Sequence, residues 1–460
     1  MEVVNSMASI DQATANGRPL VPGWNLTAAS EAVPGQRFYL LFVLCLVLIS
    51  IPVKNLAYIV PPIFLFFELI AGERSAWRTV LWMALFTVLS GASMIFDAMR
   101  GQAINVPGLL FALLTYLPMF LFLASRADRE IDASLFPKFI DLTAWFVIVQ
   151  SLVGAVQFAL SGNGDAVTGT FGLLDFHLNT ISITQVYFTF TLFGMLLFLM
   201  LDSQRMLPRI AIVAGLLTCA VAQSGHQTIF FAACLALCCM LQFRRVGTAL
   251  GGIALVGCLT FIVVQLYPDT LVLTKEWYKK VVQDPRSSKR MVLDDSAEYL
   301  SDPKNALLGV GLGQYSSRAA LISSNIYLNM ELPGPLSGQS TYFVDSMIPA
   351  MRRFDEVGEG SAIPKPYFSA LSVVMELGPP LALICLGVMV VHLRRNLRWM
   401  LSSNPKIARI GLVSCTGLLF FLLCCIIENY IEFPQGIFLP YLLYLVAQAR
   451  ATQLSTSLPE

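Results

Sequence analysis

Residues 79–96, TVLWMALFTVLSGASMIF, form a run of eighteen residues without a charged side chain. As an α-helix such a run rises about 1.5 Å per residue, which is enough to cross most of a hydrocarbon core of about 30 Å. Similar apolar runs of about 16–25 residues recur between residues 37 and 450. The sequence therefore predicts a chain that crosses a membrane many times.

The composition supports the same fold class. The chain of 460 residues is 56% hydrophobic and 13% charged, and its mean hydropathy is +0.69. Soluble domains are roughly 45–50% apolar and about 25% charged. We predict an all-α polytopic membrane protein with about twelve transmembrane helices and one large, partly helical loop. The predicted spans are 38–53, 56–71, 79–96, 106–124, 139–160, 180–201, 209–222, 228–243, 247–267, 367–392, 408–427 and 437–449.

Lysine and arginine are unevenly distributed between the predicted connections. With the N-terminus inside, the inner segments carry seventeen of them, and the short outer segments carry only Lys54 and Arg100. Positively charged loops favour the cytoplasmic side. The bias therefore predicts a flexible cytoplasmic tail at 1–36, a second cytoplasmic tail at 451–460, and the large loop 268–366 on the outer face.

Two predicted hairpins are too short for two full crossings. Residues 209–243 number thirty-five, whereas two perpendicular crossings need about forty, and residues 38–71 have the same shortage. The tip of the first hairpin, residues 223–227 (QSGHQ), should therefore lie below the outer surface. Polar backbone at that depth is tolerated only against protein or a water-filled cavity.

The large loop is expected to contain helices at 275–283 and 288–300. In the second helix, Val292, Ala297 and Leu300 can share an apolar face. The glycine string 309–313 (GVGLG) is not a nucleotide-binding fingerprint, and tight packing of a turn is its expected role. The rest of the loop, rich in glycine, proline and serine, is expected to be irregular.

A base-rich stretch lies in this loop just outside the predicted membrane. It consists of Lys275, Lys279, Lys280, Arg286, Lys289 and Arg290. Clustered basic side chains suit a diphosphate, because a guanidinium can pair with two phosphate oxygens at once. The alternative is a basic surface that faces solvent or touches lipid headgroups. The overall net charge of +1 does not favour a nucleic-acid partner.

Two further titratable residues fall in apolar surroundings. His226 lies at the buried hairpin tip, where a proton acceptor or a phosphate partner is one interpretation and a histidine bonded to a neighbouring carbonyl is the other. Glu376 lies about ten residues into the span 367–392, just before Pro379 and Pro380, which should break that helix. A carboxylate beside a broken helix favours a cavity wall, and a structural salt bridge is the alternative.

Four short motifs occur in the order found in one family of membrane proteins. The segments Arg290-Met-Val-Leu and Ala306-Leu-Leu-Gly-Val-Gly-Leu-Gly-Gln314 resemble the signature in the large loop of the O-antigen polymerase and O-antigen ligase superfamily. Gly169-Thr-Phe-Gly172 followed by Asn179 resembles the family's "GTFxxxN" motif. Ser224-Gly-His226 lies where the family often has Ser-Arg, and Glu376-Leu-Gly378 resembles its "ELG".

The chain departs from that family pattern at two places. Ligases carry a histidine about eleven residues before the glycine of "ELG", but Tyr367 and Phe368 stand here. His226 replaces the usual arginine of the hairpin tip. Both departures favour a polymerase of exopolysaccharide, capsule or O-antigen type over a ligase.

The resemblance implies a glycosyltransferase in the bacterial inner membrane, with the loop 268–366 in the periplasm. Such an enzyme moves a glycan from undecaprenyl diphosphate to an incoming lipid-linked repeat unit. It uses no metal or other cofactor, and its expected partners are a chain-length regulator and an export complex. Arg290, His226 and Glu376 are the expected catalytic residues, and Arg286, Lys289, Lys280 and Arg318 are expected to bind the diphosphate. A ligase-type transferase, a twelve-helix transporter and a non-catalytic scaffold for export are the alternatives.

Overall fold

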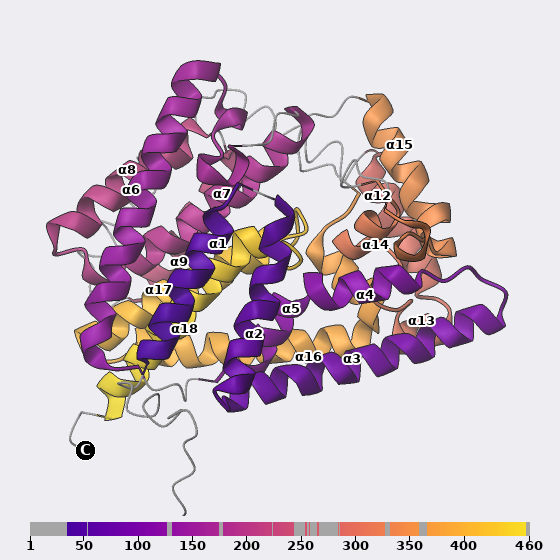
Figure 1. Ribbon diagram of the computed structural model, residues 1–460, viewed down its shortest axis with the longest axis horizontal. Coiled ribbons are helices and arrows are strands. Elements are labelled where there is room, and N and C mark those ends of the chain that lie inside the picture. The colour runs from indigo at the N-terminus through magenta and orange to yellow at the C-terminus, as the bar shows by residue number, and fades with distance from the viewer. Residues whose placement is uncertain are drawn as a thin grey trace, which may run out of the picture.

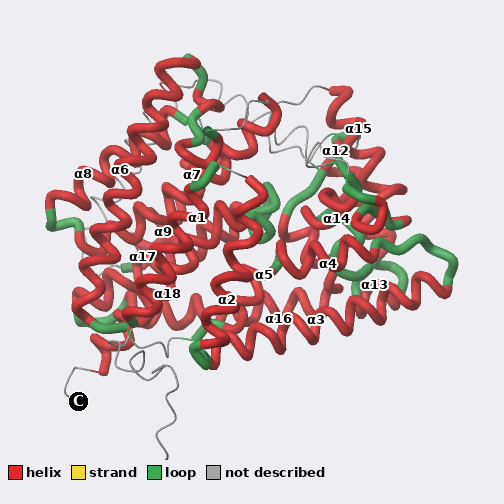
Figure 2. The backbone as a smooth tube through the Cα atoms, viewed as in Figure 1, coloured by secondary structure: helices red, strands yellow, loops and turns green. Residues whose placement is uncertain are grey.

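In a computed structural model, the described residues form helices and connecting turns, with no strand among them (Figures 1 and 2). The structure describes residues 35–52, 54–126, 131–173, 178–222, 224–242, 286–326, 332–357 and 366–456, with single residues at 254, 257, 265 and 284. Within these ranges the all-α fold expected from the sequence is confirmed. The predicted helix 275–283 lies outside them, and so does the predicted span 247–267 apart from the single residues 254, 257 and 265.

The described α-helices cover most of the predicted spans. In chain order they are α1 (Gln36–Ser50), α2 (Val60–Ile70), α3 (Arg74–Met99), α4 (Val106–Thr115), α5 (Leu117–Ala124), α6 (Phe136–Ser161), α7 (Leu178–Leu199), α8 (Met206–Val221), α9 (Gly225–Leu241), α12 (Ser288–Tyr299), α13 (Pro303–Leu308), α14 (Arg318–Ser323), α15 (Ile348–Val357), α16 (Ser369–Met400), α17 (Pro405–Cys424) and α18 (Pro434–Thr456).

Five described helical segments are long and apolar enough to cross a membrane. They are 74–99, 133–161, 184–202, 369–400 and 405–424, and the bent pair α4–α5 makes a sixth if it counts as one span. The sequence predicts two hairpins with short helices. Their helices α1, α2, α8 and α9 have 15, 11, 16 and 17 residues, as expected. The total of twelve crossings stays a prediction.

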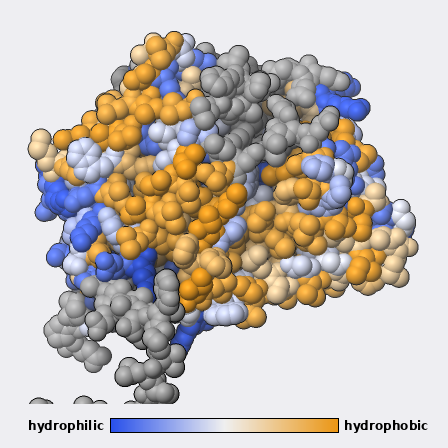
Figure 3. Space-filling model, viewed as in Figure 1, coloured by the Kyte–Doolittle hydropathy of each residue, from blue (hydrophilic) through white to orange (hydrophobic). Residues whose placement is uncertain are grey.

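The long apolar helices differ in how deeply they are buried. The apolar window of 184–202 is 83% buried, whereas that of α3 is only 28% buried. Exposed side chains on α3 include Leu81, Val88 and Ile95. Figure 3 shows hydrophobic residues over much of one face of the molecule. A central α7 and an outer α3 that exposes apolar side chains fit a protein that lies in lipid.

Two predicted spans contain breaks. The predicted span 106–124 is two helices bent by 50°, which meet at Tyr116 just before Pro118. The helix α16 is interrupted at Gly378, where φ is 77°, immediately before Pro379 and Pro380. The proline break expected in the tenth span is therefore confirmed, and glycine supplies the unusual backbone conformation there.

The described part of the predicted large loop contacts the C-terminal end of α3 (Figure 1). Lys304 Nζ lies 2.6 Å from the Asp97 carboxylate in a buried ion pair, and Arg100 pairs with Asp302. On the side assigned to the inner face, Arg205 of the connection between α7 and α8 pairs with Asp141 in the N-terminal part of α6. Segments that the charge bias assigns to one side of the membrane therefore contact one another.

The loop has its own small apolar core, built on α12. Val292 and Tyr315 are among its fully buried side chains, and Phe368 of the α16 approach packs on it. The predicted helix 288–300 is confirmed as α12, but its expected face is wrong at Ala297, which is exposed. Ser296 is buried instead, because its hydroxyl meets the Tyr315 hydroxyl at 2.9 Å.

The second half of the loop is more regular than expected. It contains α14 and a helical segment that runs through 343–357 as one π-helical stretch followed by α15. Serine N-caps such as Ser317, whose side chain accepts from the Ala320 N–H, start helices in a sequence that looks irregular by composition.

The side of the membrane on which the loop lies is testable by labelling. We expect a cysteine introduced at Ser337 to react with an impermeant maleimide once the outer membrane is permeabilised, and a cysteine at Ser402 to stay unlabelled. The nine described native cysteines are all buried, so their background should be low. Labelling at Ser402 without labelling at Ser337 would reverse the predicted orientation.

Candidate functional site

The glycine-rich turn after α13 packs directly on the break of α16. The Val310 N–H donates to the Met375 carbonyl at 2.8 Å, and Gly309 and Gly311 both have positive φ. A Cβ added at Gly309 would lie 2.4 Å from the Gly378 backbone nitrogen. The tight packing expected of 309–313 is therefore confirmed, and it joins two of the motifs that carried the family resemblance.

This contact should be sensitive to a single methyl group. We expect Gly378→Ala to lower the melting temperature and the membrane level of the protein, because φ is +77° and a Cβ would lie 2.6 Å from the Gly309 nitrogen. Gly387→Ala in the same helix is the matched control, since nothing lies within 4 Å of its Cβ position. Equal thermal stability of the two variants would contradict this account.

The Glu376 carboxylate binds residues 313–317, the turn that follows the glycine-rich segment, to α16. It is fully buried, and its two oxygens accept from the backbone N–H groups of Gly313, Tyr315 and Ser317 at 2.8, 3.0 and 3.2 Å. The Tyr116 hydroxyl adds a longer contact at 3.4 Å. Because its oxygens are already engaged, Glu376 is better placed to hold the turn than to accept a proton from a substrate.

The turn held by Glu376 leads into Arg318, the first residue of α14. Arg318 is only 1% exposed. Its guanidinium donates to the Tyr187 hydroxyl and lies 4.6 Å from the centre of the Phe433 ring. Its backbone N–H donates to Oε2 of Glu432. Burial alone lowers the pKa of Arg318, but neighbouring groups led by Tyr187 outweigh it and raise that pKa, so the side chain stays charged.

A buried polar turn, residues 425–433, connects α17 to α18. The Asn429 side chain donates to the Ser316 carbonyl at 3.1 Å, and the Ser369 N–H donates to the Glu428 carbonyl at 3.3 Å. Sequence analysis overlooked this turn, although the segment ENYIE at 428–432 places two carboxylates between two apolar spans. The buried polar residues of the turn are Glu428, Asn429, Tyr430 and Glu432.

Two side chains at the end of this turn have polar atoms that are not engaged. Oε1 of Glu432 is buried and makes no close hydrogen bond within the described part of the chain, although the Tyr116 and Ser372 hydroxyls interact with this carboxylate. Both polar atoms of the fully buried Gln435 side chain also make no close hydrogen bond to a described residue. Burial raises the pKa of Glu432 above its usual range, and the negative charge of Glu376 adds to the effect. Such unpaired buried groups call for an explanation, and a substrate is one.

The hairpin tip reaches this region through Gln227. Its side-chain nitrogen donates to the Val186 carbonyl at 2.7 Å and to the Tyr430 hydroxyl, while its oxygen accepts from Thr189. His226, the neighbouring residue, is half-buried at the start of α9. The polar tip is therefore packed against protein, as its expected depth requires.

The predicted basic residues are divided between the interior and the surface. Lys289 is buried, and its Nζ donates to the Ile427 carbonyl of the polar turn at 3.0 Å. Arg290 is about half exposed, at 48%, and makes a two-pronged ion pair with Asp294 one helical turn away, at 2.9 and 3.0 Å. Lys289 thus anchors the first turn of α12 beside 425–433, while Arg290 remains accessible.

The other two predicted diphosphate ligands are placed differently. Arg286 is exposed just before α12, and Lys280 lies outside the described residues. Arg318 contacts Glu432 directly, whereas no hydrogen bond or ion pair given by the described residues links Arg286 or Arg290 to that carboxylate. The structure therefore brings Glu376, Arg318 and Lys289 to the polar turn and leaves Arg286 and Arg290 on the surface of α12.

The described side chains include no group of three or more His, Cys, Asp and Glu residues arranged to hold a metal ion. In comparisons with known proteins, no protein-family model and no curated protein matches the chain. Membership of the O-antigen polymerase and ligase superfamily therefore stays a prediction that rests on the four motifs.

Proposed function

We propose that the protein is a polymerase of lipid-linked oligosaccharide repeat units on the periplasmic face of a bacterial inner membrane. The donor is a glycan on undecaprenyl diphosphate, and the acceptor is an incoming repeat unit on the same type of carrier. The motif resemblance gives the reaction class. The chemistry of the polar turn gives the residues that would perform it.

In this proposal, Glu432 is the general base. A hydroxyl of the acceptor sugar attacks the anomeric carbon of the donor, and the bond from that carbon to the diphosphate oxygen breaks. The hydroxyl proton passes to Oε1 of Glu432, and undecaprenyl diphosphate leaves with the electron pair of the broken bond. Arg318 acts as a positioning residue, because its backbone N–H occupies Oε2 and leaves Oε1 for the substrate.

The developing negative charge on the diphosphate requires fixed cations. We assign this role to Arg290 in the first turn of α12 and to Arg286 just before that helix, where the helix dipole also favours an anion. The exposed Asp294 is the present partner of Arg290. A diphosphate, with two charges and several acceptor oxygens, can replace that carboxylate because a single surface ion pair contributes little, about 0–1 kcal/mol. Lys289 keeps this helix beside the turn.

A single observation carries the proposal. Glu432 and Gln435 lie three residues apart and are fully buried, and Oε1 of Glu432 and both polar atoms of the Gln435 side chain make no close hydrogen bond to a described residue. A carboxylate oxygen and a side-chain amide of this kind match what an acceptor sugar needs, namely a base for one hydroxyl and hydrogen bonds for its neighbours.

The experiment that tests this function is deletion of the gene followed by analysis of lipid-linked sugars. We expect the deletion strain to accumulate carriers with a single repeat unit and to lose the polymer, and the wild-type gene to restore it. Polymer of normal length and amount in the deletion strain would exclude a polymerase. Polymer that accumulates inside the cell would favour the transporter.

The base assignment also predicts the dependence of the rate on pH. Glu432 must be deprotonated to accept a proton, and burial raises its pKa. The polymerisation rate should therefore fall as the pH drops through this raised pKa, at a higher pH than an ordinary glutamate with a pKa of about 4.3 would give. A rate that stays constant down to about pH 5 would argue against a buried glutamate as the base.

A further inference from the structure

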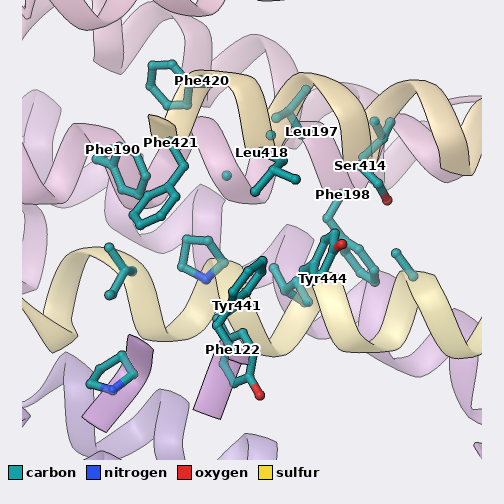
Figure 4. A pocket seen from close by; sticks show the side chains of 18 of the residues that line it. Phe122, Phe190, Leu197, Phe198, Ser414, Leu418, Phe420, Phe421, Tyr441 and Tyr444 are labelled. Carbon is teal, nitrogen blue, oxygen red and sulfur yellow. The ribbon is translucent and has the colours of Figure 1, made fainter. Parts of the chain in front are cut away.

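An apolar cavity of about 120 Å³ lies inside the helix bundle (Figure 4). Side chains of α5, α7, α16, α17 and α18 line it, including Phe122, Phe190, Phe420 and Tyr444. It is neither a sealed void nor an open surface. Protein interiors are normally packed without voids of this size, and an apolar cavity only slightly larger holds a benzene molecule.

One residue of the polar turn 425–433 forms part of the cavity wall. Ile431, which lines the cavity, precedes Glu432 in the chain. The Phe190 ring also lines the cavity and lies 4.8 Å from the Tyr430 ring and 5.1 Å from the Phe420 ring. The wall of the cavity is therefore continuous with the polar turn through Ile431 and the aromatic rings beside Tyr430.

The lining excludes a polar ligand such as a sugar. Most of its side chains are aromatic or aliphatic. Of its hydroxyl groups, that of Tyr441 already donates to the Leu121 carbonyl at 3.0 Å, and that of Tyr444 lies 3.1 Å from the Asn396 amide nitrogen. A hydrocarbon is the ligand class that gains most from such surroundings, since it buries apolar area. Of the lining hydroxyls, that of Ser414 makes no described hydrogen bond.

We propose that this cavity holds the part of the isoprenoid chain that lies next to the diphosphate of the carrier lipid. The inference rests on the proposed function for the identity of the carrier, and on the cavity for the place of its chain. A chain held in this fixed cavity would keep the donor's anomeric carbon at a fixed distance from the polar turn. The ordering of the chain is thereby coupled to the positioning of the reacting carbon.

Gly417 of α17 allows a direct test. It lines the cavity, and a Cβ built on it would meet only Leu197 Cδ1, at an ordinary 3.5 Å. A side chain at position 417 can therefore begin at Cβ without a clash, so Gly417→Phe is the filling variant and Gly417→Ala is the matched control. Ser414→Leu is a second filling variant, because the Ser414 hydroxyl has no described hydrogen bond to lose.

The measurement is binding of undecaprenyl phosphate to the purified full-length variants, with phosphatidylglycerol as the competing membrane lipid. We expect Gly417→Phe and Ser414→Leu to weaken undecaprenyl phosphate binding by about tenfold or more, as the loss of a few buried methylene contacts implies. Gly417→Ala should bind like the wild type, all variants should keep the wild-type melting temperature, and phosphatidylglycerol should bind equally to all.

Unchanged undecaprenyl phosphate binding in both filling variants at wild-type stability would overturn the proposal. So would an equal loss of phosphatidylglycerol binding, because the cavity would then be a general lipid site. The binding assay needs no polymer formation. If no polymer forms under any condition but the filling variants still bind the carrier weakly, the proposed function fails and the chain-binding cavity stands.

Discussion

Glu432→Gln should reduce polymer formation by about a hundred- to ten-thousandfold while the protein remains folded. The glutamine has the shape of the glutamate and can still accept the Arg318 N–H with its oxygen. It cannot take up a proton from an attacking hydroxyl. The loss should therefore appear in the rate of polymerisation and not in the melting temperature or in the membrane level.

The matched control is Glu298→Gln on the exposed face of α12, which should polymerise normally. His226→Gln separates the two candidate bases. Loss of polymer in His226→Gln together with normal polymer in Glu432→Gln would transfer the base to the hairpin tip, as the sequence first indicated. Normal polymer in both variants would leave the proposed mechanism without a base.

Arg290→Ala should lower the rate by about a hundred- to thousandfold, the usual cost of removing a donor that stabilises charge in a transition state. Its only described ion pair is with Asp294 on the surface, so the substitution should change stability by less than about 1 kcal/mol. A large loss of activity at unchanged stability would therefore indicate that Arg290 interacts with the substrate.

Two further variants distinguish a planar fork from a simple charge. Arg290→Lys should retain only a small fraction of the activity, because an ammonium does not pair with two phosphate oxygens at once. Asp294→Asn should keep activity, since it only releases the arginine. Near-normal polymer from Arg290→Lys would reduce the role of this residue to attraction of an anionic surface, and near-normal polymer from Arg290→Ala would remove the diphosphate site from α12.

The sequence predicts the helices well because apolar runs and proline positions are local signals. The break of α16 at Gly378 is an example, since Pro379 and Pro380 predict it. The bend between α4 and α5 was missed, although Pro118 gives the same kind of signal. Both features follow from the backbone chemistry of one or two neighbouring residues.

The site was harder to predict because its contacts connect distant parts of the chain. Glu376 was recognised as a buried carboxylate, but its partners at 313–317 lie about sixty residues earlier. Ser296 replaces Ala297 on the buried face of α12 only because the Tyr315 hydroxyl lies opposite. Nothing in the local pattern of either residue contains that information.

The importance of Glu432 was not apparent from the sequence for a related reason. Arg318 was expected to bind the diphosphate, but only the fold shows that it is buried beside Glu432. Arg290, in contrast, is prominent in the sequence because it heads a motif, yet it lies on the surface. Sequence motifs indicate which segments belong to the site. Only the fold shows which side chains of those segments are buried together.

The measurement that tests the central claim most directly uses the purified protein in lipid vesicles. The substrate is the single-unit lipid carrier that a deletion strain is expected to accumulate, with no nucleotide sugar and no other protein added. The account predicts that the wild-type protein converts this carrier into longer glycans and free polyprenyl diphosphate, and that Glu432→Gln does not. Wild-type protein that is folded, as judged by its melting temperature, and leaves the single units unchanged would contradict the account.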